Sequence, residues 1–494
     1  MSIVRDADGY FNIYDLARGL GGHLIHFGCF SLSGIRVDRI KIDSRKVSCG
    51  DAFATFRGKN TDGETYAPEA FARGAVAVIC SRGGALRIGV RGIYIEVDDV
   101  AAAIKRLAVE VRRDGGAHVV GITGSVGKTT VRELCRCVLS QRFLTDSSEE
   151  NFNNALGVSL SIVNAFSAET VERCGKSAEN DGKYLVLEMG ISLPGEMDEL
   201  VKIAYPEIAV ITNIGVMHSE TLGGRNCVAR EKSRIGRDAR AVVCPWDPIL
   251  FENGFLDSEK CTVLCLGDEV EWCGFGGVGH VSFSDADGEE LYGDFDISFD
   301  SPSGENVEYM GFTAPIVGRH GVFDSAIAVA VGRLCGVSES EIRAGLREYS
   351  PIGMRQILER DGGILRIVDC YNSGPDSVRA ALSAMVKYSD YYGCKRRVTV
   401  LGSMLELGEI SRTEHYSLGR ELVGYGIDLL FCIGSEAREI ARGAFDGGMD
   451  AELIFCFDGD SEREKIKNFI ASKTGEGDII LYKASRGIRL EELT

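Results

Sequence analysis

The chain lacks the features that mark membrane-spanning, secreted and metal-knuckle proteins. No apolar run approaches the roughly 18 residues that a membrane-spanning helix requires, and residues 1–8 carry two acids where a signal peptide has an apolar stretch. The 16 cysteines are scattered, and no two have the Cys-x-x-Cys spacing of a zinc knuckle or redox motif. We therefore expect a cytoplasmic protein with no membrane span, whose cysteines are mostly reduced and buried.

Basic residues are in deficit. The 494 residues contain 55 Lys and Arg against 73 Asp and Glu, which gives a net charge of −18. Proteins that bind nucleic acid need clustered Lys and Arg to neutralise phosphates. We therefore expect no nucleic-acid partner, although one local basic pocket for an anionic small molecule is compatible with this charge.

The chain is too long for one ordinary core, and its patterns predict three α/β domains. Residues 1–115 contain short strands and turns, which indicate a smaller, independent N-terminal domain. Residues 116–348 alternate apolar strands with helical runs, as in a mostly parallel sheet covered on both faces, with an antiparallel excursion over residues 256–315. Residues 349–494 alternate again and predict a doubly wound, Rossmann-like domain.

The most informative segment is Gly121-Ile-Thr-Gly-Ser-Val-Gly-Lys-Thr-Thr130, which joins a predicted strand, His118–Ile122, to a helical run. Backbone N–H groups of such a turn surround phosphate oxygens, a lysine adds positive charge, and a following hydroxyl ligates Mg²⁺. Ile122 stands where the strict phosphate-loop pattern has glycine. The alternative is a glycine-rich turn without a ligand, which Gly-Lys-Thr-Thr directly after a strand disfavours. We predict a nucleoside-triphosphate site made by Gly124, Ser125, Gly127, Lys128, Thr129 and Thr130.

Three more candidate residues follow strands of the same predicted sheet. Ligands gather at the carboxyl ends of such strands, and Glu188 ends the predicted strand Tyr184–Glu188, where it is placed to bind Mg²⁺. His218 follows the next strand, and Lys232 lies in a helical segment after it. Alone, each has a structural explanation as a capping acid, a surface histidine or a solvated lysine. Their shared position around one phosphate loop favours a function.

These motifs resemble those of the Mur ligase family, ATP-dependent amide-bond-forming enzymes of peptidoglycan precursor synthesis. The resemblance extends over essentially the whole chain. Besides the phosphate loop and the residues above, it includes Asn151-Phe-Asn-Asn-Ala-Leu-Gly157, Glu188-Met-Gly190 and Thr212-Asn-Ile-Gly215.

Within the family, three segments are most similar to the members that join D-alanyl-D-alanine to UDP-N-acetylmuramoyl-tripeptide. They are Asp43-Ser-Arg45 with Asp62-Gly63, Asp369-Cys-Tyr-Asn-Ser-Gly-Pro-Asp-Ser377, and Leu401-Gly-Ser-Met-Leu-Glu-Leu-Gly408. The Asp-Asn-Pro-Arg signature of the sibling that adds the third residue is absent. The third residue of the tripeptide stays open.

The resemblance implies an ATP-dependent carbon–nitrogen ligase that uses ATP and Mg²⁺. A substrate carboxylate takes the γ-phosphoryl group, and an amine then attacks the acyl phosphate. Lys128 would balance the β- and γ-phosphates, Thr129 and Glu188 would hold one Mg²⁺, and His218 would help to hold a second. The family's lysine at the position of Lys232 is carbamylated, which turns a cation into a carboxylate-like group that can organise metal.

The resemblance also implies that the C-terminal domain closes over the central one and expels water. Arg355 and Asp369 would approach the nucleotide. We expect a monomer whose substrate-binding residues are Ser44, Arg45, Asn153, Asn154, Tyr371, Asn372, Ser485 and Arg486.

Several positions depart from the family pattern. His320-Gly-Val-Phe-Asp324 replaces His-Asn-x-x-Asn, whose asparagine helps to hold the adenine, so the adenine contacts stay open. Ser403 replaces an aspartate, Ser373-Gly374 replaces Ala-Asn, and Ala484 replaces a glycine, but the phosphate and metal residues are kept. The alternatives are a sibling ligase of different amino-acid specificity, a nucleotide-binding scaffold that has lost ligation, and a P-loop kinase or motor.

Overall fold

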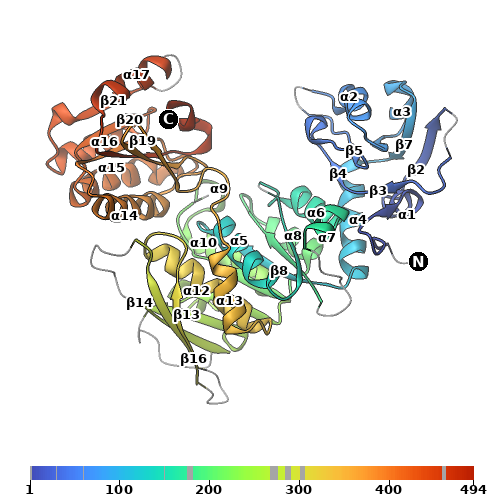
Figure 1. The fold of residues 1–494 in the computed structure, drawn as a ribbon, viewed down its shortest axis with the longest axis horizontal. Coiled ribbons are helices and arrows are strands. Elements are labelled where there is room, and N and C mark those ends of the chain that lie inside the picture. The colour runs from blue at the N-terminus through green and yellow to red at the C-terminus, as the bar shows by residue number, and fades with distance from the viewer. Residues whose placement is uncertain are drawn as a thin grey trace.

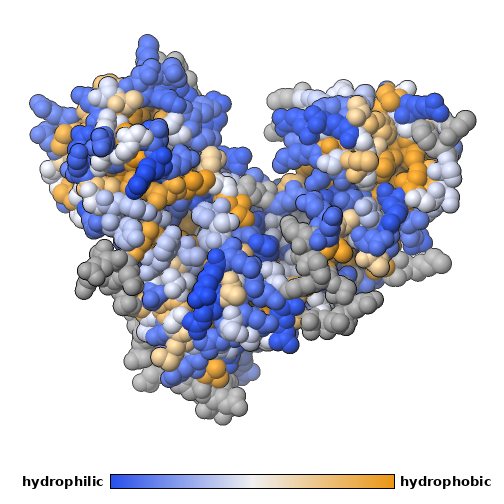
Figure 2. Space-filling model, in the orientation of Figure 1, coloured by the Kyte–Doolittle hydropathy of each residue, from blue (hydrophilic) through white to orange (hydrophobic). Residues whose placement is uncertain are grey.

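The computed structural model describes residues 3–28, 31–58, 61–149, 151–174, 182–217, 219–266, 276–283, 291–300, 306–458 and 463–494. Across these ranges the strands form four sheets, of two, five, nine and six strands. Figure 1 shows an N-terminal lobe and a C-terminal lobe, each joined to a central lobe that holds the nine-stranded sheet. Figure 2 shows an open notch between the two outer lobes above the central one.

The five-stranded sheet lies in the N-terminal lobe, and apart from the antiparallel edge strand β2 its strands are parallel. Its order is β2 (His23–Phe27), β7 (Gly92–Val97), β6 (Ala77–Ser81), β5 (Ala52–Ala54) and β4 (Ile40–Lys41). A small antiparallel pair adjoins it, made by β1 (Phe11–Asn12) and β3 (Arg36–Val37). The helices are α1 (Ile13–Gly19), α2 (Ala67–Ala72), α3 (Gly84–Ile88) and α4 (Val100–Asp114), with short 3-10 turns η1 (Ser44–Lys46) and η2 (Gly63–Tyr66).

Helix α4 ties this lobe to the central one. Its buried residues Ile104 and Leu107 belong to the same hydrophobic cluster as Leu160 of the central lobe. The Asn164 amide also exchanges two hydrogen bonds with the Ile40 backbone, at 2.8 and 3.0 Å. The N-terminal and central sheets are therefore separate, but they share one continuous core.

The central sheet is parallel from β9 to β14 and antiparallel from β14 to β16. Its order is β16 (Asn306–Thr313), β15 (Asp294–Asp300), β14 (Gly277–Phe283), β13 (Cys261–Leu266), β12 (Ala241–Pro245), β11 (Ile208–Ile211), β8 (Ala117–Thr123), β10 (Lys183–Glu188) and β9 (Leu144–Ser147). The predicted mostly parallel sheet is confirmed. The predicted antiparallel excursion is wrong in extent, because β13 and β14 still pair in parallel and all four strands continue the same sheet.

Helices cover both faces of this sheet, and consecutive strand residues enter opposite cores. In β10, Val186 packs into the core beneath α5 and α12, whereas Leu185 and Leu187 pack into the core beneath α6 and α8. This explains why the strand is apolar from Tyr184 to Leu187, between the charged residues at its two ends. The helices are α5 (Lys128–Ser140), α6 (Ala155–Asn164), α7 (Ala168–Cys174), α8 (Glu196–Ala204), α9 (Ser219–Leu222), α10 (Arg225–Ser233), α11 (Pro248–Phe251), α12 (Arg319–Leu334) and α13 (Glu339–Arg347).

The C-terminal lobe is doubly wound, as predicted. Only β17 runs antiparallel among the described strands of its sheet, whose order is β17 (Ile357–Asp361), β18 (Ile364–Asp369), β22 (Asp478–Lys483), β19 (Arg396–Gly402), β20 (Leu429–Ile433) and β21 (Ile454–Phe457). The helices are α14 (Pro375–Tyr392), α15 (Ser411–Leu422), α16 (Arg438–Asp446) and α17 (Arg463–Lys473). Helix α14 begins at Pro375, a residue well suited to a first helical turn. Within the described ranges, no helix has both the length and the apolar character to cross a membrane.

Candidate active site

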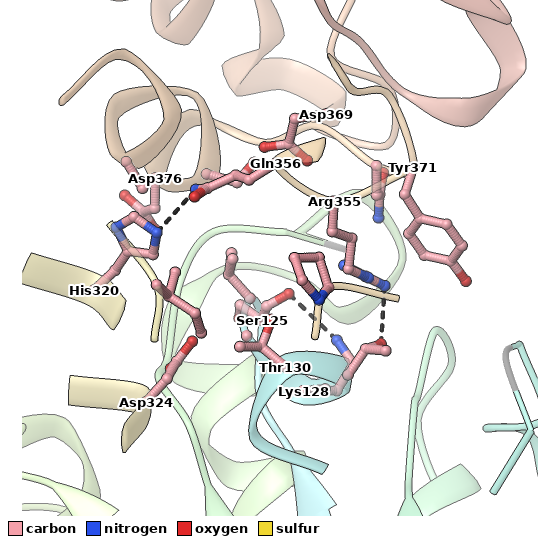
Figure 3. A pocket seen from close by; sticks show the side chains of 18 of the residues that line it. Ser125, Lys128, Thr130, His320, Asp324, Arg355, Gln356, Asp369, Tyr371 and Asp376 are labelled. Carbon is pink, nitrogen blue, oxygen red and sulfur yellow. Dashed lines mark hydrogen bonds between the residues drawn. The ribbon is translucent and has the colours of Figure 1, made fainter. Parts of the chain in front are cut away.

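A cavity of about 850 Å³ lies between the phosphate loop and the C-terminal lobe. Figure 3 shows side chains from both lobes converging on it, with Lys128 and Ser125 below and Arg355, Asp369 and Tyr371 above. The carboxyl ends of β8 and β10 open into this space, as the strand-end rule predicts.

The phosphate loop runs from the end of β8 into α5. Its backbone at Gly127 has a φ of 83°, which favours glycine, and a Cβ added at Gly124 would lie 1.9 Å from the Thr212 hydroxyl oxygen. The N–H groups of Ser125 and Val126 donate to the side-chain oxygen of Asn213, at 3.0 and 2.9 Å. Asn213 therefore shapes the loop, a role that the sequence analysis missed. The first N–H groups of α5, which have no intrahelical acceptor, are those directed at phosphate oxygens.

Thr129 and Glu188 meet beneath the loop. The Thr129 hydroxyl donates to Glu188 Oε2 at 2.6 Å, and the Asn153 amide donates to Oε1 at 3.0 Å. Burial acts to raise the pKa of Glu188, but the Lys128 charge and these two hydrogen bonds outweigh it and lower the pKa. The result is an ionised, buried carboxylate beside a hydroxyl, a donor set that fits Mg²⁺.

Two lysines converge on one carbonyl oxygen. Lys128 Nζ donates to Gly124 O at 2.9 Å and to Ser125 O at 3.3 Å, and Lys232 Nζ donates to Gly124 O at 3.0 Å. Lys232 is only 1% exposed. Burial, followed by the nearby Lys128 charge, lowers the pKa of Lys232 well below its ordinary value. Such an amine is more often neutral and nucleophilic than a surface lysine.

The C-terminal lobe contributes an arginine to this cluster. Arg355 Nη2 donates to the Thr129 hydroxyl oxygen at 2.9 Å, and its guanidinium lies 4.0 Å from the centre of the Tyr371 ring. Arg486 lies 5.5 Å from the centre of the same ring. The Tyr371 hydroxyl donates to Asn151 of the central lobe, so these contacts hold the two lobes together.

Other predicted residues of the C-terminal lobe hold its loops. Asp369 and Asn372 line the cavity, and buried Lys483 contacts both, through Asp369 Oδ2 at 3.0 Å and Asn372 O at 3.0 Å. Ser485 accepts a hydrogen bond from Leu405 N and donates to Ser373 O. Lys483 was not among the predicted site residues, although it stands two residues before the predicted Ser485.

His320 and Asp324, which stand where the family pattern has its adenine-binding motif, both line the cavity. His320 Nε2 and Gln356 Nε2 are 2.9 Å apart (Figure 3), and burial lowers the pKa of His320 to about 4. Asp324 faces the phosphate loop, since a Cβ added at Gly127 would lie 3.0 Å from its Oδ1. Burial raises the pKa of Asp324 well above its ordinary value. A neutral carboxyl presents an O–H donor and a carbonyl acceptor, much as the amide of asparagine presents an NH₂ donor group and a carbonyl acceptor.

Two predicted substrate residues lie away from this cavity. Ser44 and Arg45 belong to η1 of the N-terminal lobe, where Ser44 donates to Glu69 at 2.8 Å and Arg45 pairs with Asp43 at 2.8 Å. The paired Arg45 lowers the pKa of Asp43 to about 2.

Asn154 borders the cavity and also caps α6, because its side-chain oxygen accepts from Gly157 N. His218 lies outside the described residues.

Three consecutive matches to Mur ligase domains span the chain. Residues 36–112 match the Mur ligase family catalytic domain, residues 122–332 the Mur ligase middle domain, and residues 354–486 the Mur ligase glutamate ligase domain. A relative from Bacillus subtilis (strain 168), the UDP-N-acetylmuramoyl-tripeptide–D-alanyl-D-alanine ligase, is 29% identical and covers 92% of each chain.

Solved structures agree. MurF from Acinetobacter baumannii superposes with a TM-score of 0.74 and 25% identity over 98% of both chains. MurF ligase from Thermotoga maritima in complex with ADP has a TM-score of 0.65 and 25% identity, and covers 92% of this chain and 96% of its own. With its domain order, its fold and its phosphate loop all in agreement, the chain belongs to the Mur ligase family.

Proposed function

We propose that the chain is an ATP-dependent ligase that joins D-alanyl-D-alanine to UDP-N-acetylmuramoyl-tripeptide in peptidoglycan precursor synthesis. The observation that carries this proposal is the convergence of Lys128, Thr129, Glu188 and Lys232 beneath a phosphate loop that faces Arg355 of the C-terminal lobe. A scaffold without chemistry has no need of this buried set. The relative from Bacillus subtilis that carries the same ligase name matches over nearly the full length of both chains.

The reaction moves negative charge, and the residues of the site supply positive charge and donors where it develops. The tripeptide carboxylate takes the γ-phosphoryl group of ATP and ADP leaves, after which the amine of D-alanyl-D-alanine attacks the acyl carbon and phosphate leaves. Lys128 and Arg355 neutralise the phosphoryl oxygens, together with the N–H groups at the start of α5. Thr129 and Glu188 would hold Mg²⁺, which supplies further charge neutralisation when bound.

The lobes have different proposed tasks. Residues 1–115 bind the UDP-sugar-peptide with the help of Ser44 and Arg45, residues 116–348 bind ATP, and residues 349–494 bring the amine. Lobe closure protects the acyl phosphate from water, and the contact between Tyr371 and Asn151 supports such closure. The protein acts in the cytoplasm as a monomer.

Product analysis tests this proposal directly. The purified protein is incubated with Mg²⁺-ATP and UDP-N-acetylmuramoyl-tripeptide, with and without D-alanyl-D-alanine, using both diaminopimelate and lysine tripeptides. The expected result is ADP release that depends on the dipeptide, with a product mass equal to the joined substrates. Release of ADP with a single amino acid instead would identify a sibling ligase. ATP binding without product from any amine would support the scaffold alternative.

A further inference from the structure

Two cysteines lie side by side at the outer edge of the C-terminal sheet, and neither of them lines the cavity. Cys432 of β20 and Cys456 of β21 are direct partners in the parallel pairing of these strands. Neighbouring strands are about 4.8 Å apart, which is within the Cα separation that a disulfide tolerates. Because residues in register point to the same face of a sheet, the two thiols are neighbours.

The two thiols differ in their access to solvent. Cys432 is fully buried in the core under α16, together with Ile440 and Ala441. Cys456 is exposed, because β21 is the edge strand at that side of the sheet. A reagent in solution therefore reacts with Cys456 first, because Cys432 is not accessible to solvent.

The surroundings of Cys456 favour its thiolate. The Cys432 thiol donates a hydrogen bond to it, and this bond, helped by the charge of Arg438 against the effects of burial and of Asp458, lowers the pKa of Cys456 to about 7. In Cys432 the effect is opposite, since burial and the neighbouring thiolate raise the pKa. The exposed sulfur is thus the nucleophile and the buried one keeps its proton.

We propose that Cys456 and Cys432 form a redox-active thiol pair, in which Cys456 is oxidised by a peroxide and Cys432 resolves it to a disulfide between β20 and β21. The Cys456 thiolate attacks one oxygen of hydrogen peroxide, the O–O bond breaks, and the leaving hydroxide takes a proton to become water. Cys432 sulfur then attacks the sulfenic acid sulfur. The S–O bond breaks, and the departing hydroxide leaves as water with the Cys432 proton. Two thiols are oxidised and one peroxide is reduced to two waters.

Other cysteines provide internal comparisons. Cys244 and Cys261 also contact each other, but both are fully buried and out of reach of an oxidant in solution. Cys49 is exposed like Cys456, and no cysteine partner pairs with it across a strand, since it lies outside the described strands. Cys49 is therefore the matched control for exposure alone.

The first measurement uses the unmodified full-length protein. Reduced protein is alkylated with limiting iodoacetamide at neutral pH, and the labelling of Cys456 and Cys49 is followed by peptide mass spectrometry. Relative to an ordinary thiol, a thiol with a pKa near 7 has about 15-fold more thiolate at neutral pH. Each thiolate is about fivefold less nucleophilic, because nucleophilicity falls with the pKa. We expect Cys456 to react about threefold faster than Cys49, with a labelling midpoint near its lowered pKa. Equal rates with parallel pH profiles would overturn the proposal.

The second measurement detects the bond. After treatment with a small excess of hydrogen peroxide, the expected product is a peptide pair that links Cys432 to Cys456, with the loss of two hydrogens and reversal by a thiol reductant. Cys432→Ser should instead accumulate a sulfenic acid at Cys456 that dimedone traps, and Cys49→Ser should behave like the parent protein. Oxidation of Cys456 in the parent protein to sulfinic acid without any linkage would overturn the resolving role of Cys432. The ligase assay is not needed for either readout, so this inference stands or falls separately from the proposed function.

Discussion

Arg355 of the C-terminal lobe donates a hydrogen bond at 2.9 Å to the hydroxyl oxygen of Thr129, the residue that follows the phosphate-loop lysine. The same hydroxyl donates to Glu188 at 2.6 Å. A residue from beyond the central sheet thus completes the hydrogen bonding of the phosphate loop. The position of the C-terminal lobe is therefore linked directly to the hydrogen bonding of the phosphate site.

Arg355→Ala should lower kcat/KM for ATP by about 100-fold, the usual effect of removing one charged donor from a phosphoryl-transfer site. Arg355→Lys should recover little of this loss, because an ammonium group cannot reproduce the guanidinium's position over the Tyr371 ring. The measurement is ADP release at varied ATP concentration. Arg412→Ala, which changes an arginine of the same lobe with a 71% exposed side chain, is the control and should keep full activity. Equal activity of Arg355→Lys and the parent protein would contradict this assignment.

Glu188→Gln should lower kcat by about 100- to 1,000-fold, since it removes the negative charge that favours Mg²⁺ but keeps the size of the side chain. The Mg²⁺ concentration needed for half-maximal ADP release should rise. Glu196→Gln changes a second acid that lines the cavity, one whose side chain accepts from Ser192 N and Leu193 N, and it should leave the Mg²⁺ requirement unchanged. If both variants shifted the Mg²⁺ requirement equally, Glu188 would not be the metal ligand.

Much of this site follows from sequence, because strand periodicity and the phosphate-loop spacing are local signals. Glu188 was placed at a strand end by the apolar run before it, and the structure brings it to Thr129. The contributions of Asn213 and Asn151 were missed. Both residues stand in segments that carry the family resemblance, but Asn213 acts on backbone N–H groups of a distant turn and Asn151 receives a side chain from another lobe. Neither contact could therefore be predicted from local sequence.

In the fold, too, local features could be predicted from the sequence and contacts between distant segments could not. Alternating apolar runs predicted the parallel strands of both large sheets, since the inner strands are buried on two faces. Strand β14 pairs in parallel with β13 and antiparallel with β15. Its alternating sequence is equally compatible with both kinds of pairing, so the point at which the sheet changes from parallel to antiparallel could not be predicted. The shared core around α4 depends on contacts between lobes, which periodicity within one lobe does not encode.

Lys232→Ala should abolish ligation while ATP binding persists, and short carboxylic acids should restore part of the activity. The reason is that a carbamylated Lys232 presents a carboxylate beneath the phosphate loop, which a small free carboxylate can replace. Burial, followed by the Lys128 charge, lowers the pKa of Lys232 well below its ordinary value, and this favours the neutral amine that reacts with CO₂. The readouts are ADP release and the intact mass in bicarbonate, which should rise by one CO₂.

Lys202→Ala, which changes a lysine in the last turn of α8, is the control and should leave activity and the CO₂-dependent mass gain unchanged. An alanine variant at Lys232 with full activity would rule out the carbamylation.

Asp324→Asn should raise the free energy of unfolding relative to that of the parent at pH 8, and by a smaller amount at pH 5. Burial raises the pKa of Asp324 in the folded state, so the folded chain keeps a proton that the unfolded chain releases above about pH 4. The contribution of this group to the free energy of unfolding is therefore complete below that pH and is lost as the pH rises toward the folded-state pKa. Asparagine does not titrate, so its variant avoids the loss. Urea midpoints of both proteins at the two pH values measure the difference.

Asp361→Asn provides the reference, because the Asp361 side chain is 75% exposed. Within the described residues its ion-pair partner is Arg366, at the surface. Its midpoints should run parallel to those of the parent. Since asparagine keeps a donor group and a carbonyl acceptor where a neutral carboxyl has them, Asp324→Asn should also keep ATP binding at both pH values, whereas Asp324→Ala should weaken it. Parallel stability profiles for the parent and Asp324→Asn would mean that Asp324 is ionised in the folded protein, with a counter-charge beside the phosphate loop.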